Sequence, residues 1–202
     1  MPGPSVIVGI LGLQGDVVEH VAALERCGVE TRVAKTQEDL AAVDALVVPG
    51  GESTTVMRLL ERFELRAPII ARVKAGMPLW GTCMGMIVAA HDVAGLTQPT
   101  LDLIDITVRR NAFGRQIASA EMELAIPALG PVPFPAVFIR APWVERVGPT
   151  VDVLASVDGH PVFVRSGNVV ATAFHPELTG DDRVHRFFLS LVGREDAQRT
   201  AA

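Results

Sequence analysis

The stretch that decides the fold spans residues 78–91 and reads PLWGTCMGMIVAAH. A short apolar strand over 78–80 runs into the pattern Gly-x-Cys-x-Gly at 81–85, and a helix is predicted to continue over 86–91. A sharp strand-to-helix turn crowds the backbone, so small residues must flank the side chain at its tip. The stretch therefore has the form of a nucleophile elbow, with Cys83 in the position of the nucleophile.

The thiol of Cys83 sits where a reactive cysteine is expected. The helix that begins after it directs the partial positive charge of its N-terminus at the sulfur, which stabilises a thiolate. The alternative is a small buried hydrophobic residue, the commonest role of a cysteine. The frame of Gly81 and Gly85 favours the nucleophile. Cys27 has no such frame, and we expect it to be structural.

Strands and helices alternate in the segments that precede the elbow. A buried strand is predicted at 6–13 and further short strands at 31–34 and 45–48, with helices at 16–27, 38–43, 53–63 and 68–74. This alternation is typical of a mostly parallel sheet with helices on both faces. We therefore predict a three-layer α/β fold.

The second half of the chain changes character, because Gly, Pro and Asn punctuate a series of short apolar segments. Strands are predicted at 101–109, 118–126, 136–140, 151–157, 161–165 and 169–174, followed by a helix at 182–192. We expect them to add antiparallel strands to an edge of the sheet. The whole chain, 1–202, is predicted to form a single domain, with a disordered tail after about residue 193.

Composition excludes several classes of function. Of the 202 residues, 49% are apolar and 20% charged, and 18 basic against 23 acidic residues give a net charge of −5. No basic run indicates a nucleic-acid partner, and no apolar run is long enough for a membrane span. The two cysteines form no CxxC or zinc-ligand pattern. We expect a cytoplasmic protein without a bound metal.

A candidate general base follows the predicted strand at 169–174. His175-Pro176-Glu177 is extended around the proline, so the side chains of His175 and Glu177 point to the same side. Glu177 can then hold one imidazole nitrogen while the other faces the thiol. The alternative is a turn histidine beside a surface glutamate. His20 and His185 lie in predicted helices and are expected to be surface or satisfied polar residues, whereas His91 and His160 are placed at a helix end and in a turn.

Residues 49–53 read PGGES and join a predicted strand to a predicted helix. Because ligands of open α/β sheets bind at the carboxyl ends of the strands, this loop, Cys83 and His175 should meet at one edge. The backbone N–H groups of Gly51 and Met84 would then form an oxyanion hole. The alternative is an ordinary Gly-rich turn.

Six segments together carry a resemblance to a known family. They are QGD at 14–16, PGGESTT at 49–55, GTC at 81–83, RNAFGRQ at 110–116, FIRAP at 138–142 and HPEL at 175–178. From about residue 6 to residue 192, the chain resembles the glutaminase subunits of pyridoxal 5′-phosphate synthase, which are class I (triad-type) glutamine amidotransferases. The resemblance implies a flavodoxin-like, class I glutamine amidotransferase fold.

The resemblance also implies a reaction and a set of site residues. Cys83 attacks the side-chain amide of L-glutamine to give a γ-glutamyl thioester and ammonia, and His175 and Glu177 complete the triad. The positions that match glutamine-binding residues of the family are Gly51, Glu52, Ser53, Arg110, Ile139 and Arg140. No cofactor is implied. Met84 departs from the family pattern, since a small residue is expected there.

The implied partner is an oligomeric synthase subunit with a (β/α)8 barrel. It combines the ammonia with ribose 5-phosphate and glyceraldehyde 3-phosphate to make pyridoxal 5′-phosphate, and its docking completes the oxyanion hole near Gly51. We hypothesise that Gln14 lies near that interface. The alternatives are a γ-glutamyl hydrolase, a glutaminase that serves another synthase, and a non-catalytic redox sensor that uses Cys83.

Overall fold

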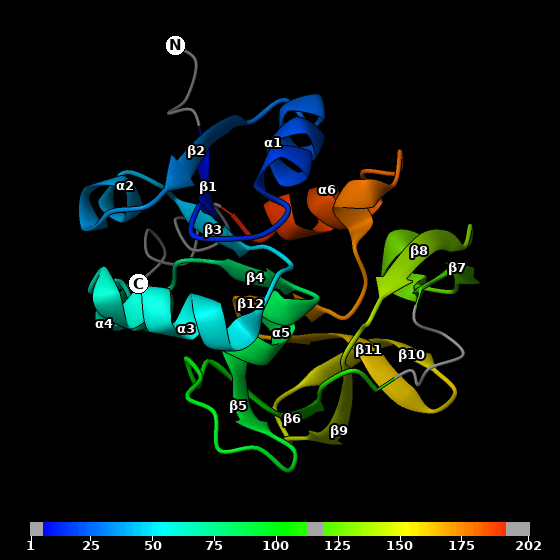
Figure 1. Ribbon diagram of the computed structural model, residues 1–202. Helices are drawn as coiled ribbons and strands as arrows, with labels where there is room; N and C mark the ends of the chain where they lie inside the picture. Colours follow the sequence, from blue (N-terminus) through cyan, green and yellow to red (C-terminus); the bar gives the residue numbers. More distant parts are fainter. Residues whose placement is uncertain (1–5, 113–118, 193–202) are drawn as a thin grey trace, which may run out of the picture.

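The computed structural model describes residues 6–112 and 119–192, and a seven-stranded sheet runs through it in the order β10-β11-β12-β4-β3-β1-β2 (Figure 1). Five neighbouring strands are parallel: β2 (Glu30–Ala34), β1 (Ile7–Leu11), β3 (Ala45–Val48), β4 (Leu79–Thr82) and β12 (Val169–Thr172). At one edge, β11 (His160–Ser166) and β10 (Asp152–Val157) add in antiparallel orientation. The predicted parallel sheet with added antiparallel strands is therefore confirmed.

Helices cover both faces of this sheet (Figure 1). One face carries α1 (Val17–Arg26) and α6 (Arg183–Leu189), and both contact Trp80 of β4. The other face carries α3 (Ser53–Arg62), α4 (Arg66–Lys74) and α5 (Met84–Ala89), and the short α2 (Gln37–Ala41) packs against α4. The predicted three-layer arrangement is confirmed.

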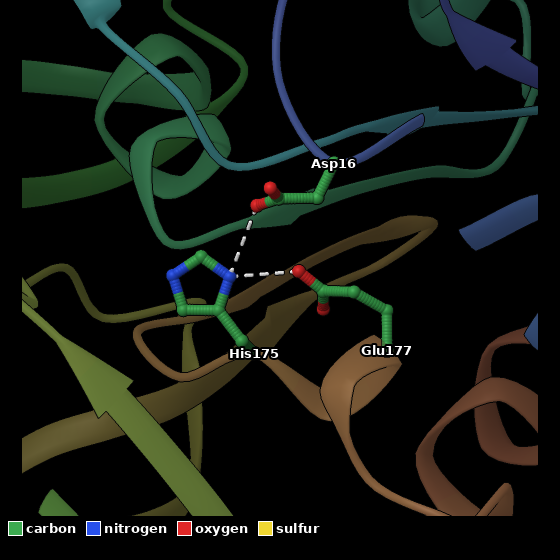
Figure 2. A group of neighbouring side chains, drawn as sticks. All are labelled: Asp16, His175 and Glu177. Atoms are coloured by element: carbon green, nitrogen blue, oxygen red, sulfur yellow. Dashed lines mark hydrogen bonds and ion pairs between the residues drawn. The ribbon is translucent and has the colours of Figure 1, made fainter. Parts of the chain in front are cut away.

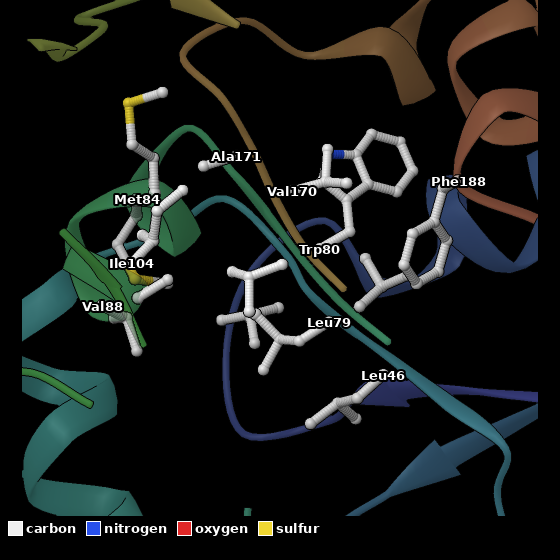
Figure 3. Packing of buried hydrophobic residues seen from close by; sticks show 14 of the residues in the cluster. Leu46, Leu79, Trp80, Met84, Val88, Ile104, Val170, Ala171 and Phe188 are labelled. Carbon is white, nitrogen blue, oxygen red and sulfur yellow. The ribbon is translucent and has the colours of Figure 1, made fainter. Parts of the chain in front are cut away.

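The core lies on both sides of the central strands. Every residue of β3, β4 and β12 is buried, which explains why these strands read as apolar runs without alternation. Figure 3 shows the indole of Trp80 beside Phe188 of α6, with Met84 and Val88 of α5 elsewhere in the same apolar cluster. The buried indole N–H donates to Oγ1 of Thr172 at 3.1 Å, so the strand that leads into the elbow is tied to its neighbour.

The predicted helix over 86–91 is wrong at both ends. The helix begins at Met84, and residues Ala90–Val93 form strand β5, which pairs in parallel with β6 (Ile104–Arg109). Backbone N–H groups of Leu101 and Leu103 donate to the carbonyls of Val88 and Ala89 at 2.8 and 2.9 Å. Because these carbonyls accept hydrogen bonds from residues 101 and 103 rather than from a further helical turn, the helix ends at Ala89 and the chain becomes extended.

The additional strands do not all extend the main sheet, which differs from the prediction. Strands β5, β6 and β9 (Trp143–Val147) form a second sheet, and β7 (Ser119–Leu124) pairs with β8 (Phe134–Ile139) in a third. Strand β9 is absent from the predicted strands because its centre is charged. Glu145 and Arg146 are held there by ion pairs with Arg109 and Asp105 across from them.

Other boundaries move by a few residues from their predicted positions, and short 3-10 turns occur at Pro127–Leu129 (η2) and Pro176–Leu178 (η3). Residues 113–116 of the RNAFGRQ segment and the predicted disordered tail after 193 lie outside the described residues. None of the helices in the described ranges is both long enough and apolar enough to cross a membrane.

Candidate active site

A pocket of about 360 Å³ opens at the carboxyl ends of the parallel strands. In the main sheet β2 lies on one side of β1 and β3 on the other, so the strand order reverses between β1 and β3. Open α/β sheets bind ligands at such a switch point. Nine of the predicted site residues line this pocket: Gly51, Glu52, Ser53, Cys83, Met84, Arg110, Ile139, Arg140 and His175. Glu177, which is 5% exposed, lies beneath them.

Cys83 stands at a tight turn between β4 and α5, in the strained backbone conformation of a nucleophile elbow (φ 48°, ψ −105°). Its N–H donates to the carbonyl of Thr172 at 2.7 Å. The flanking glycines are required by backbone contacts. A Cβ at Gly81 would lie 2.3 Å from the carbonyl oxygen of Gly85, and a Cβ at Gly85 would lie 2.1 Å from that of Val48.

His175 is held by its backbone and by its ring. Its N–H donates to the carbonyl of Val137 in β8 at 2.8 Å. Nδ1 lies 2.7 Å from Oε1 of Glu177, whose side chain is fully buried (Figure 2). The imidazole and Cys83 line the same pocket, and the thiol raises the pKa of the ring, while Sγ of Cys83 lies 3.9 Å from the carbonyl oxygen of Ile139. The chain thus aligns a thiol, an imidazole and a carboxylate in the order that a triad requires.

Asp16 is a site residue that the sequence analysis missed. Its position before α1 is that of a helix cap, but its side chain makes no capping hydrogen bond. Instead Oδ2 lies 3.3 Å from Nδ1 of His175 (Figure 2). Gly15 permits this approach, because a Cβ there would lie 1.6 Å from the carbonyl oxygen of Gly50. The QGD segment was the available signal, since it closely follows the first strand.

Two carboxylates and a thiol decide the charge of His175. Burial lowers the pKa of its imidazole, but the interactions with Asp16, Cys83 and Glu177 outweigh burial and raise that pKa to about 12. Burial also raises the pKa of Glu177, while the bond to His175 opposes this rise and favours the carboxylate. His175 is accordingly an imidazolium at neutral pH.

The same three residues offer the one group of metal-ligand type within the described ranges, with ligand atoms of Asp16, His175 and Glu177 all within 4.8 Å of one another. Both carboxylates face a single nitrogen, Nδ1, at 2.7 and 3.3 Å. At these separations both carboxylates can accept the proton on Nδ1. A metal ion could bind that nitrogen only by replacing the proton, so the geometry favours a protonated ring over a metal site.

Glu52 and Arg110 form a charged wall of the pocket. Partial burial raises the pKa of Glu52, but hydrogen bonds from Thr54 and Thr55 outweigh it and lower that pKa to about 2. Nη2 of Arg110 donates to Oε1 of Glu52 at 3.1 Å, and Nη1 donates to Gln98 at 3.2 Å. Ser53 also donates to Gln98, at 3.2 Å. The cation is therefore held in position on a pocket wall.

The loop of the predicted oxyanion hole is fixed by Gln14. Its side-chain oxygen accepts the N–H of Glu52 at 3.1 Å, directly after Gly51. Met84 is 2% exposed and still lines the pocket. Arg140, at the end of β8, adopts a left-handed backbone conformation (φ 46°) and reaches the pocket. The oxyanion role of Gly51 and Met84 and the interface role of Gln14 stay predictions.

The expectation that His20 and His185 are surface or satisfied residues is wrong. Both residues are fully buried, and neither Nδ1 of His20 nor either ring nitrogen of His185 has a hydrogen-bond partner among the described residues. His20 lies on the inward face of α1, together with Ala23 and Leu24. Its spacing from Leu24 was the signal for burial.

The chain is similar to known proteins over almost its whole length. The sequence profile of the SNO glutamine amidotransferase family matches residues 10–194. The chain is 54% identical over 191 residues to the pyridoxal 5′-phosphate synthase subunit PdxT of Mycobacteroides abscessus, covering 93% of this chain and 98% of that one. It is 48% identical over 185 residues to the subunit PdxT of Thermotoga maritima, covering 92% of this chain and 98% of that one.

Solved structures agree with this relationship. One, described as a glutamine amidotransferase, is 46% identical with a TM-score of 0.87, covering 92% of this chain and 98% of that one. A chain of PurLQS from Thermotoga maritima shares the fold alone, at 15% identity with a TM-score of 0.70 and coverage of 92% and 98%. The chain belongs to the SNO glutamine amidotransferase family.

Proposed function

We propose that this chain hydrolyses L-glutamine to L-glutamate and ammonia at Cys83. The observation that carries the proposal is the aligned set of Cys83, His175 and Glu177 at the base of a charged pocket. If Cys83 lacked a nearby base, or if His175 lacked its carboxylate, a redox sensor would explain the site as well as a hydrolase does. The complete set favours nucleophilic catalysis.

The first half of the reaction uses the imidazolium. The Cys83 thiolate attacks the amide carbon, and the backbone N–H groups of Gly51 and Met84 receive the developing oxyanion. His175 then gives its proton to the leaving nitrogen. The C–N bond breaks, ammonia departs, and a γ-glutamyl thioester remains on Cys83.

The second half needs a base, and the change of charge at Cys83 supplies one. The contact with Cys83 and its negative charge raise the pKa of His175, and this effect disappears when the sulfur becomes a thioester. The imidazole, which has just lost its proton, can therefore take a proton from water as that water attacks the thioester. Glu177 keeps Nδ1 protonated throughout. Glutamate leaves, and the thiolate and imidazolium are restored.

The walls of the pocket match the charges of glutamine. Arg110 and Arg140 line the pocket and would bind the α-carboxylate, and Glu52, charged at neutral pH, would accept hydrogen bonds from the α-ammonium. Ser53 and Ile139 complete the binding surface. We propose that these residues, together with Gly51, hold the substrate.

We further propose that the ammonia passes to a separate synthase protein, an oligomeric (β/α)8 barrel, which makes pyridoxal 5′-phosphate from ribose 5-phosphate and glyceraldehyde 3-phosphate in the cytoplasm. The names of the PdxT relatives support this assignment over a γ-glutamyl hydrolase or a glutaminase of another synthase. The test is glutamate release from glutamine with and without the cognate synthase subunit. Strong stimulation that Cys83→Ala abolishes is expected, whereas full activity without the synthase contradicts the assigned pathway.

A further inference from the structure

A buried polar cluster lies directly beneath the triad and has no part in the reaction described above. Nε2 of His20 lies 3.1 Å from Oγ1 of Thr82 and 3.4 Å from Oε2 of Glu177. The side chains of His20 and Glu177 are both fully buried. The ring of His20 packs edge-on against Trp80, with ring centroids 5.4 Å apart.

The two oxygens of the Glu177 carboxylate have different surroundings. Oε1 accepts from His175 at 2.7 Å. Oε2 has no other side-chain hydrogen bond within the described ranges, and Nε2 of His20 lies 3.4 Å from it. A buried charged oxygen without a hydrogen-bond donor costs folding free energy, so a proton on Nε2 that faces Oε2 stabilises the carboxylate.

The surroundings of His20 decide where its proton lies. Burial, together with the nearby His185 and His175, lowers the pKa of His20, so its ring is neutral and carries one proton. If that proton were on Nδ1, a buried donor would be left without any acceptor, because Nδ1 has no partner in the described ranges. The proton on Nε2 instead faces the Thr82 hydroxyl and the Glu177 carboxylate. The carboxylate is the stronger acceptor of the two.

We propose that His20 is a positioning residue, whose Nε2–H faces Oε2 of Glu177 and holds the carboxylate so that Oε1 stays on Nδ1 of His175. This inference rests on the proposed triad and extends it from Cys83, His175 and Glu177 to a fourth side chain. His20 does not touch the substrate. It acts by fixing the orientation and the charge of Glu177.

The charge of Glu177 gives the proposal a pH signature. Asp16, His175 and His20 face Glu177, and His185 of α6 faces His20 from the far side. A donor on Oε2 favours the carboxylate, so removing that donor raises the pKa of Glu177. The acid limb of activity then moves to higher pH, because protonated Glu177 no longer holds the imidazolium of His175.

The experiment compares His20→Leu, His20→Gln and His20→Asn with the matched control His185→Leu. His185 is equally buried and also packs on Trp80, at 4.9 Å between ring centroids. The terminal amide of Gln reaches the position of Nε2, whereas that of Asn reaches only the position of Nδ1. Each variant is assayed as the full chain with the cognate synthase subunit, and its thermal unfolding is recorded.

His20→Leu is expected to lower kcat about 10- to 100-fold, the effect of one hydrogen bond to a charged group. It should also move the acid limb up by about one pH unit. His20→Gln should stay within about threefold of the native rate, as should His185→Leu, since neither removes a donor from Oε2. If His20→Leu does not fold, the difference in kcat between His20→Gln and His20→Asn decides the question. The proposal is overturned if His20→Leu and His185→Leu lose activity equally, or if His20→Gln and His20→Asn do.

A second readout separates this proposal from the proposed function. In a Cys27→Ser background Cys83 is the remaining cysteine of the two, and its alkylation by iodoacetamide is followed against pH. His20→Leu should raise the acid limb of that profile, and His185→Leu should leave it in place. If the native chain releases no glutamate, the proposed function fails, and the alkylation profiles still decide the role of His20.

Discussion

Gly50→Ala tests how closely the glycine loop fits the imidazole of His175. A Cβ at this position would lie 2.6 Å from Cε1 of His175 and 2.7 Å from Oδ2 of Asp16. Ordinary contacts of a Cβ begin at 3.4 Å, so the ring must retreat by about 0.8 Å. A misplacement of about 1 Å costs an enzyme on the order of 100-fold in rate, and we expect that loss in kcat/KM for glutaminase activity.

The control is Gly180→Ala, where nothing lies within 4 Å of the added Cβ. Both variants are assayed with the synthase subunit present, and thermal unfolding reports whether each remains folded. Gly180→Ala should keep the native rate. Native activity in a folded Gly50→Ala variant would refute the reasoning, because the ring would then not occupy the place that the structure gives it.

Three further predictions follow from the charged groups of the site. Arg110→Ala should raise KM for glutamine about 10- to 100-fold. The control Arg109→Ala should leave KM unchanged, because Arg109 pairs with Glu145 outside the pocket. Equal effects of the two variants on KM would contradict the binding role of Arg110. Asp16→Asn should lower the pKa of His175 from about 12, because the Asp16 carboxylate lies 3.3 Å from Nδ1 and is one of the groups that raise that pKa. NMR titration of the ring follows the change, and an unchanged titration would exclude that contact. Glu52→Ala should destabilise the chain by about 1 kcal/mol in urea at pH 7 through loss of the α3 cap. Since the folded-state pKa of Glu52 is lowered from 4.5 to about 2, this difference should shrink as the pH falls from 4.5 toward 2, and a difference that persists at pH 2 would argue against a charged cap.

Features that depend on neighbouring residues were predictable from the sequence. The elbow around Cys83 needs small residues at Gly81 and Gly85, and the structure shows the backbone contacts that make them necessary. The parallel sheet followed from buried apolar runs that alternate with helices. The meeting of Cys83, His175 and the glycine loop followed from the rule that carboxyl ends of parallel strands share an edge.

Features that depend on distant partners were not predictable. His20 lies 62 residues from Thr82 in the sequence, and no local pattern indicates that the two meet. Asp16 has the position of a helix cap, and only the fold brings its carboxylate to His175. Strand β9 was missed because its charged centre is stabilised by ion pairs with β6 rather than by burial.

The central claim is that Cys83 carries the glutamyl group. The most direct measurement is rapid-quench mass spectrometry of the chain after mixing with L-glutamine and the synthase subunit, with glutamate release recorded in the same samples. The account predicts a γ-glutamyl adduct on the peptide that contains Cys83, and neither adduct nor glutamate with Cys83→Ala. Glutamate release that persists in Cys83→Ala would contradict it.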